Sequence, residues 1–187
     1  MTQPQQPGTG ITPPVRPSLV LVQKSLEIDS PAFAELCSEL LGIGVAVRFR
    51  AKGDSMAPLV RHGDTLSVEP LPRGAARAGD VVLFRSQIGY TLAHRVIGQC
   101  RQEGSLRFTI QGDNLQRADG VIPPERIYGK VVSVERGGVA FSLSEPPMML
   151  LGWLAVVQSR WGLRRRRWWR AVGRIARQLL PFARYLA

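Results

Sequence analysis

A serine, two histidines and two aspartates lie in short segments whose residue types suit nucleophilic catalysis. A serine hydroxyl is a weak nucleophile until a neighbouring base removes its proton and backbone amides face the developing oxyanion. Ser55 lies in the segment Lys52–Leu59, where Gly53 allows the main chain to turn sharply and a substrate backbone to approach closely. Ser55 is therefore a candidate nucleophile, although a serine in such a turn is usually an ordinary loop residue.

Either histidine could serve as the general base for this serine. His94 lies within the apolar segment Tyr90–Ile97, and a neutral imidazole that titrates near neutral pH is the natural partner of a hydroxyl. His62 lies in a turn just after the serine segment, where a solvated loop residue is the simpler interpretation. We therefore expect His94 to be the base and keep His62 as its rival.

A carboxylate behind the imidazole would complete the constellation, because it holds the other ring nitrogen and stabilises the imidazolium. The segment Gln111–Asp119 offers two candidates, Asp113 and Asp119. Gly-Asp-Asn is also a common turn sequence, so this segment alone favours a turn. The residues do not decide which of the two aspartates contacts the histidine.

The chain around these residues predicts a helix followed by short strands. Ser30 can cap a helix that has Pro31 in its first turn, and Gly42 and Gly44 end the helical spacing of apolar residues. One face of this helix is apolar. It consists of Phe33, Leu36, Cys37, Leu40 and Leu41.

From Val45 onward, apolar and other residues alternate with the period of a half-buried strand. Many short strands without helices between them indicate a mainly β domain, a small antiparallel β-barrel or sandwich. Further strands are predicted at Thr65–Val68, Val81–Arg85, Tyr90–Ile97, Leu106–Gln111, Gly129–Glu135 and Val139–Leu143.

Taken together, the segments resemble the signal peptidase I family of serine peptidases, in particular its histidine-using branch from archaea and the endoplasmic reticulum. The Ser-Met-x-Pro box of that family is matched by Ser55–Pro58, and its His-Arg-Val segment by His94–Val96. Its Gly-Asp-Asn box, with a second aspartate six residues after the first, is matched by Gly112–Asn114 and Asp119.

The family's Gly-Asp strand entries are matched by Gly63–Leu66 and Gly79–Val82. The order and approximate spacing of the boxes agree over about Val45–Val134, roughly half of the chain. The resemblance implies a β-rich peptidase fold of signal-peptidase type and no cofactor. It also implies an extended leader or signal peptide as substrate, with small residues just before the cut.

For the site, the resemblance implies that Ser55 attacks the scissile carbonyl, with His94 as base and Asp119 or Asp113 as the orienting acid. The backbone amide of the nucleophile helps to form the oxyanion hole in this family. The neighbouring candidates for contacting the substrate or the oxyanion are Gly53 and Met56.

Three departures from the family pattern matter. Gly53 stands where relatives often have a hydroxyl that assists the oxyanion hole, and Ala32–Phe49 is too interrupted to be the usual membrane anchor. The Gly-Asp-Ser-Met form is shared with self-cleaving repressor-type peptidases, which use lysine as base. The only lysine after Ser55 is Lys130, in another context.

Two function classes remain beside the leader- or signal-peptide-cleaving endopeptidase that we expect. One is a catalytically weak or inactive peptide-binding module of the same fold. The other is an active enzyme that acts in the cytosol, as a leader peptidase for the precursors of modified peptides.

The positive charge is concentrated at the end of the chain. Nine arginines lie between Arg160 and Arg184, and no acidic residue follows Glu145. Removing these nine charges from the total of +11 leaves +2 for the first 145 residues. From Trp168 to Ala183, apolar residues recur at helical spacing among the arginines, which predicts a basic amphipathic helix suited to an anionic membrane surface. Nucleic-acid binding is the less favoured partner, and packing of Pro146–Val157 against the domain is the simplest alternative.

These patterns predict three regions: a disordered tail at 1–29, the peptidase domain at 30–145 and the Trp/Arg-rich helical tail at 146–187. Cys37 and Cys100 are expected to be free thiols. No secretory signal and no apolar window long enough to span a bilayer are evident, so we expect a cytoplasmic protein, peripheral at the membrane.

Overall fold

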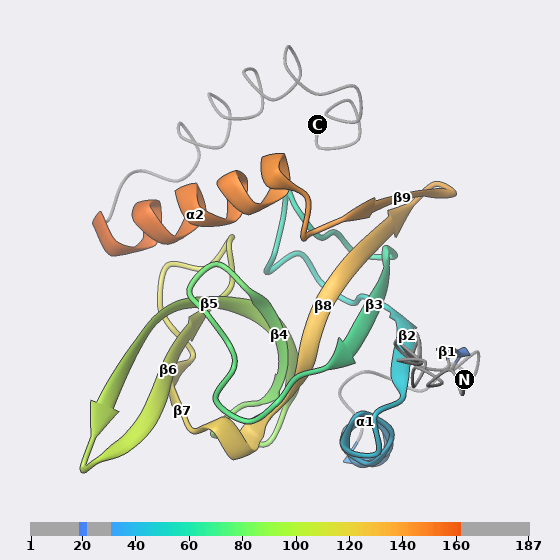
Figure 1. Ribbon diagram of the computed structural model, residues 1–187. Coiled ribbons are helices and arrows are strands. Elements are labelled where there is room, and N and C mark those ends of the chain that lie inside the picture. The colour runs from blue at the N-terminus through green and yellow to red at the C-terminus, as the bar shows by residue number, and fades with distance from the viewer. Residues whose placement is uncertain (1–18, 22–30, 162–187) are drawn as a thin grey trace, which may run out of the picture.

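A mainly antiparallel β-sheet with one N-terminal and one C-terminal helix forms the part of the chain that the computed structural model describes, residues 19–21 and 31–161 (Figure 1). The prediction of a mainly β domain with an N-terminal helix is confirmed. The elements are β1 Leu19–Leu21, α1 Pro31–Gly42, β2 Ala46–Arg50, β3 Thr65–Pro70, β4 Val81–Arg85, β5 Thr91–Gln102, β6 Ser105–Gln111, β7 Gly120–Ile122, the 3₁₀ helix Pro124–Arg126, β8 Ile127–Arg136, β9 Val139–Ser142 and α2 Pro146–Trp161.

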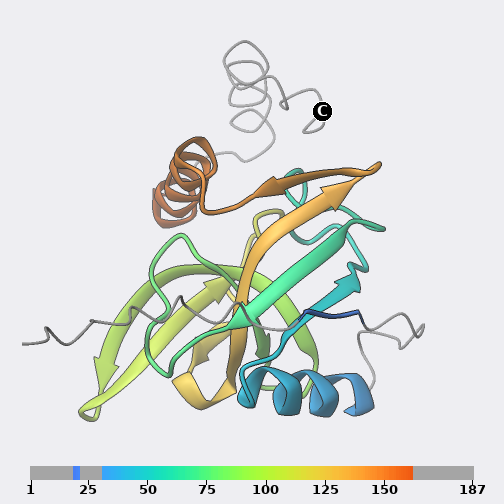
Figure 2. The ribbon, with the colours of Figure 1, turned by 45° about the vertical axis from the view of Figure 1, so that its right-hand side comes forward.

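The strands form one continuous sheet in the order β1-β2-β3-β8-β4-β5-β6-β7, with β9 paired to β8. Strand β8 therefore lies between β3 and β4, which joins the two halves of the sheet. Figures 1 and 2 show that β5 bends strongly and that the sheet is curved. Among the described residues, the β-barrel or sandwich expected from the sequence is thus a single curved sheet.

Strand β4 separates two hydrophobic cores. Its residues Val81 and Leu83 pack into a core with β2, β3, β8, α1 and α2, whereas Val82 and Phe84 pack into a second core with β6 and β7. All four side chains are buried, which accounts for the uninterrupted apolar run of this strand. Because β4 is buried on both faces, it forms a rigid support beside β5, the strand that carries His94.

Helix α1 lies on the sheet with the apolar face that the sequence predicts. Phe33, Cys37 and Leu41 are buried, and the rings of Phe33 and Phe49 make an edge-on contact with their centroids 5.1 Å apart. Figure 2 shows α1 on the opposite side of the molecule from α2.

Two short strands differ from the sequence-based expectation. Leu19–Leu21 lies in the segment predicted to be disordered, yet it forms β1 and pairs in parallel with β2. Gly120–Ile122 forms β7 on β6 and was not predicted. The remaining predicted strands match β2–β6, β8 and β9, with β5 extended to Gln102.

Helix α2 packs on the domain, as in the alternative interpretation of Pro146–Val157. Its inner face buries Met148, Leu151, Ala155 and Val156, and the first two belong to the same core as β3 and β8. The basic amphipathic helix predicted at Trp168–Ala183 lies outside the described residues. Within residues 31–161, no helix is long and apolar enough to cross a membrane.

The two cysteines are free thiols in contrasting surroundings. Burial raises the pKa of the Cys37 thiol to about 12, whereas Cys100 is exposed on β5. At pH 8 the thiolate fraction of Cys37 is then roughly 10⁻⁴, because the pH lies about four units below its pKa. We expect iodoacetamide at pH 8 to alkylate Cys100 at least about 100-fold faster than Cys37, as read by peptide mass spectrometry. If Cys37 and Cys100 of the folded protein were alkylated at comparable rates, as both should be in denaturant, the burial of Cys37 would be contradicted.

Candidate active site

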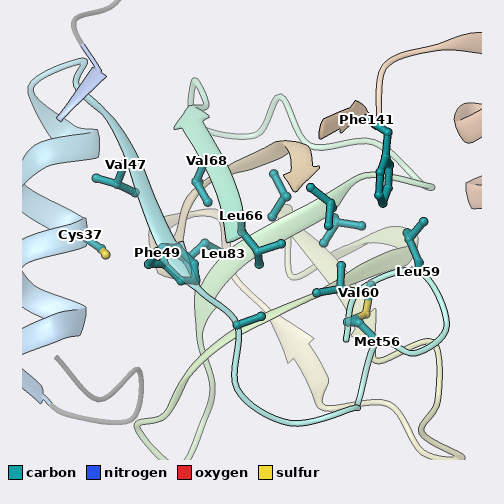
Figure 3. Packing of buried hydrophobic residues seen from close by; sticks show 14 of the residues in the cluster. Cys37, Val47, Phe49, Met56, Leu59, Val60, Leu66, Val68, Leu83 and Phe141 are labelled. Atoms are coloured by element: carbon teal, nitrogen blue, oxygen red, sulfur yellow. The ribbon is translucent and has the colours of Figure 1, made fainter. Parts of the chain in front are cut away.

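Ser55 lies in the loop between β2 and β3, which the fold holds at both ends. The Ala51 N–H donates to the Asp64 carbonyl at 2.7 Å, and the Gly63 N–H donates to the Ala51 carbonyl at 2.9 Å. Gly53 has φ of +80°, a conformation that residues with a side chain adopt only at an energetic cost. The sharp turn expected at Gly53 is therefore present. Figure 3 shows the side chains of Met56, Leu59 and Val60 on the inner side of this loop, where they join the hydrophobic core.

His94 lies on β5 and is almost fully buried, with 3% of its surface exposed. It pairs across the sheet with Val82 of β4, and the ring of Phe84 lies 6.1 Å from its own ring, measured between centroids. Both neighbours lie on β4, so this strand borders the imidazole. Its two nitrogens are used in opposite directions.

The His94 Nε2 atom lies 2.7 Å from the Ser55 Oγ atom, and the His94 Nδ1 atom lies 2.8 Å from the Asp119 Oδ2 atom. In the tautomer in which Nδ1 donates to the Asp119 carboxylate, Nε2 is left to accept from the Ser55 hydroxyl. The sequence-predicted Ser55, His94 and Asp119 are therefore joined in one chain of hydrogen bonds.

Asp119 reaches His94 because three adjacent strands bring them together. Arg95 of β5 pairs with Gln111 of β6, and the Asp119 N–H donates to the Ile110 carbonyl of β6 at 2.9 Å. Asp119 thus lies at the entry of β7, two strands away from His94. The structure places Asp119, of the two candidates, against the imidazole.

Asp113, the other candidate, forms a buried ion pair with Arg95 instead. The Arg95 Nε atom donates to Asp113 Oδ1 at 2.8 Å and Nη2 donates to Oδ2 at 2.7 Å, with 3% of each side chain exposed. The remaining Arg95 nitrogen, Nη1, donates to the Gly79 carbonyl at 2.7 Å. This bidentate pair fixes the residue next to His94 on β5.

The Gly-Asp-Asn segment also holds the serine loop. The Asn114 N–H donates to the Ser55 carbonyl at 2.7 Å, and its side-chain amide donates to the Asp54 carbonyl at 3.1 Å. The Asp113 N–H points at the Met56 sulfur, 3.3 Å away. A Cβ on Gly112 would lie 2.7 Å from the Ser55 carbonyl oxygen, so this close approach requires glycine.

His62, the rival base, does not contact the Ser55 hydroxyl. Its Nδ1 atom accepts from the Gly53 N–H at 3.3 Å, and its own N–H donates to Asp54 Oδ1 at 3.2 Å. It is exposed, and its role is to stabilise the turn before Ser55.

A second clamp behind the loop was not predicted from the sequence. Arg136 of β8 donates from Nε to Asp64 Oδ1 at 2.8 Å and from Nη2 to the Leu59 carbonyl at 3.1 Å. Arg95 and Arg136 were thus both missed, because an arginine in a strand of alternating residues is normally a solvent-facing one. The aspartates in the matched Gly-Asp boxes were the available signal for such buried partners.

A small cavity of about 60 Å³ opens beside Ser55 and His94. Because one water needs roughly 10–15 Å³ of space for its centre, the cavity accommodates a few waters or a small side chain. Its wall also includes Gly53 and Met56, the two residues expected to contact substrate. The other lining residues are Phe49, Ala51, Lys52, Val60, Leu66, Leu83, Thr91, Leu92 and Ala93.

The described residues contain no group of three or more His, Cys, Asp or Glu side chains placed to hold a metal ion. No protein-family model matches the chain, and a search of curated proteins found no match.

Proposed function

We propose that this protein is a serine endopeptidase that cleaves leader or signal peptides from precursor proteins. The observation that carries the proposal is the hydrogen-bonded chain from Ser55 through His94 to Asp119, with spacings of 2.7 and 2.8 Å. A buried imidazole between a hydroxyl and a carboxylate is the arrangement that activates a serine for acyl transfer.

In the proposed reaction, Ser55 Oγ attacks the scissile carbonyl carbon while its proton passes to His94 Nε2. Asp119 stabilises the resulting imidazolium through Nδ1. The tetrahedral intermediate collapses, the C–N bond breaks, and the imidazolium gives its proton to the leaving amine. A water molecule then attacks the acyl-enzyme with His94 again as base, which releases the carboxylate product and restores the serine.

The negative charge on the substrate oxygen needs a donor, and the Ser55 backbone N–H is the proposed one. The Gly53 N–H is already donated to the His62 ring. Gly53 has no hydroxyl, so the backbone donor carries the electrostatic stabilisation that a side chain shares in relatives of the resembled family. Met56 lies next to Ser55, buried in the core, and supports the peptide that presents this donor.

The substrate we propose is an extended peptide with a small residue just before the cut. The cavity of about 60 Å³ beside Ser55 and His94 supports this, since a methyl or hydroxymethyl side chain fits in it. Its mostly apolar wall favours an uncharged side chain.

The signal-peptidase type of fold is part of the same proposal. Three of the matched boxes support it by their positions: Ser55–Pro58 lies in the loop after β2, His94–Val96 on β5, and Gly112–Asn114 with Asp119 between β6 and β7. Lys130 forms an ion pair with Asp80 at 2.8 Å, away from the Ser55 hydroxyl, which weighs against the lysine-using repressor type.

The test is cleavage of a precursor-peptide library by the full chain, with and without anionic lipid, read by mass spectrometry. We expect cuts after Ala, Gly or Ser at a rate at least about 100-fold above cuts after Trp, because an indole exceeds a cavity that holds only a few water-sized groups. The matched control is Ser55→Ala, which leaves the loop intact and should cut nothing. Cleavage by this variant at the wild-type rate, or no cleavage by wild type, would leave the peptide-binding module as the better assignment.

A further inference from the structure

The outer face of α2 is apolar although it is exposed. Met149, Leu150 and Trp153 are exposed by 61%, 58% and 59%, while the opposite face of the helix is buried in the domain. In both ribbon views α2 lies at one outer side of the described domain, on the opposite side from α1 (Figures 1 and 2). An exposed apolar stripe of this kind marks an interaction surface.

A cavity of about 390 Å³ continues this surface toward the sheet. The three exposed side chains of α2 line one side of it, and its other walls are largely apolar, with the Asp80–Lys130 ion pair beside them. The apolar wall residues from the domain are Leu59, Val81, Val131 and Leu143. Met149, Leu150 and Trp153 thus line one largely apolar cavity together and are not scattered side chains.

The charge of the sequence that follows α2 indicates what covers this area. Eight arginines follow α2, from Arg164 to Arg184, without one acidic residue, and Arg160 lies at the end of α2 itself. The chain has 25 Lys and Arg against 14 Asp and Glu, and Asp80, which lines the cavity beside α2, is already paired with Lys130. The chain's own carboxylates therefore cannot neutralise these arginines, so an occupant that supplies both anions and apolar volume fits this area best.

We propose that the outer face of α2 docks on an anionic lipid surface. Met149, Leu150 and Trp153 enter the boundary between headgroups and acyl chains, where an indole has both apolar contact and a polar partner for its N–H. The positive charge of the arginines at 160–184 of the sequence adds electrostatic attraction to such a surface. A lipid surface is the occupant that presents anionic and apolar layers side by side.

The docking does not rest on the proposed peptidase activity, but it bears on that activity. Helix α2 packs so closely on Arg95 that a Cβ at Gly152 would lie 2.8 Å from Arg95 Nη1. Arg95 adjoins His94 in the sequence and is tied to the serine loop through Asp113. A lipid-bound α2 therefore holds the candidate active site close to the membrane surface, where precursor peptides with apolar leaders gather.

The first experiment measures the partition of the full chain onto vesicles of phosphatidylcholine with phosphatidylglycerol. Leu150→Glu is compared with Ile88→Glu, which adds the same charge at a side chain exposed by 80% in the turn between β4 and β5. We expect Leu150→Glu to weaken partition at least about tenfold more than Ile88→Glu. The Leu150 substitution removes apolar area that docking would bury in the lipid, and it places a charge between the helix and the lipid. Equal thermal unfolding of the two variants shows that folding is not the cause.

The second experiment locates Trp153 directly. In a chain with Trp161→Phe, Trp168→Phe and Trp169→Phe, the remaining indole should be quenched by lipids brominated on their acyl chains. The proposal is overturned if Trp153 is not quenched, or if both glutamate variants lose partition equally, since binding would then be through the arginines alone.

Two other occupants would also overturn the proposal and give distinct results. A second copy of the chain would show as concentration-dependent association that Leu150→Glu abolishes without lipid. Single-stranded DNA would bind at matched salt more tightly than vesicles and with the same dependence on Leu150.

Discussion

His94→Ala is expected to lower kcat for peptide cleavage by about 10⁴-fold or more, because the only proton acceptor within reach of the Ser55 hydroxyl in the described structure is removed. Ser55→Ala should lose about as much, since members of such a unit act together. The measurement is steady-state cleavage of a fluorogenic peptide built on the best sequence from the library.

His62→Ala is the matched control for this prediction. His62 is exposed and its Nδ1 atom accepts a long hydrogen bond of 3.3 Å from the Gly53 N–H, so kcat should stay within about tenfold of wild type. A larger loss with His62→Ala than with His94→Ala would reverse the assignment of the base.

Asp119→Asn and Asp113→Asn are expected to damage different properties of the protein. Asp119→Asn should lower kcat by about 10⁴-fold, because an amide in this position favours the wrong tautomer of His94. Asp113→Asn should instead lower the free energy of unfolding by about 3–5 kcal/mol, because it leaves the guanidinium of Arg95 buried without its counter-ion.

Chemical denaturation and steady-state kinetics on the same samples separate the two effects. Each variant is the control for the other, since both replace one carboxylate by an amide in the segment that connects β6 to β7. A third variant, Arg95→Met with Asp113→Leu, should recover part of the stability, because replacing both charges leaves neither unpaired. If Asp119→Asn were the more destabilising change, the assignment of orienting and structural aspartates would be wrong.

Much of the sheet was predictable, and the exceptions have physical reasons. Strands with one buried face alternate in polarity, and that period is readable from the sequence. The uninterrupted apolar run Val81–Phe84 of β4 indicates a strand that is buried on both faces. β7 has only the three residues Gly120–Ile122, too few to show a period, and its strand character comes from pairing with β6. β1 is equally short and lies in a Pro-rich segment, so only its pairing with β2 defines it.

The candidate site was predictable in its residue types but not in its pairing. Ser55 and His94 were marked by their own chemistry, whereas the choice between Asp113 and Asp119 depends on how β5, β6 and β7 align. The residues around the two aspartates do not determine how these separate strands pair. Arg95 was missed because its burial depends on α2, a helix more than fifty residues further along the chain.

The three members of the hydrogen-bonded chain come from positions 55, 94 and 119, and none of them is brought to its partner by a local turn. While the chain is being made, Ser55 is thus an ordinary alcohol until residue 119 has left the ribosome and β7 has paired with β6. The activity that we propose for Ser55 therefore depends on strands that are made after both Ser55 and His94.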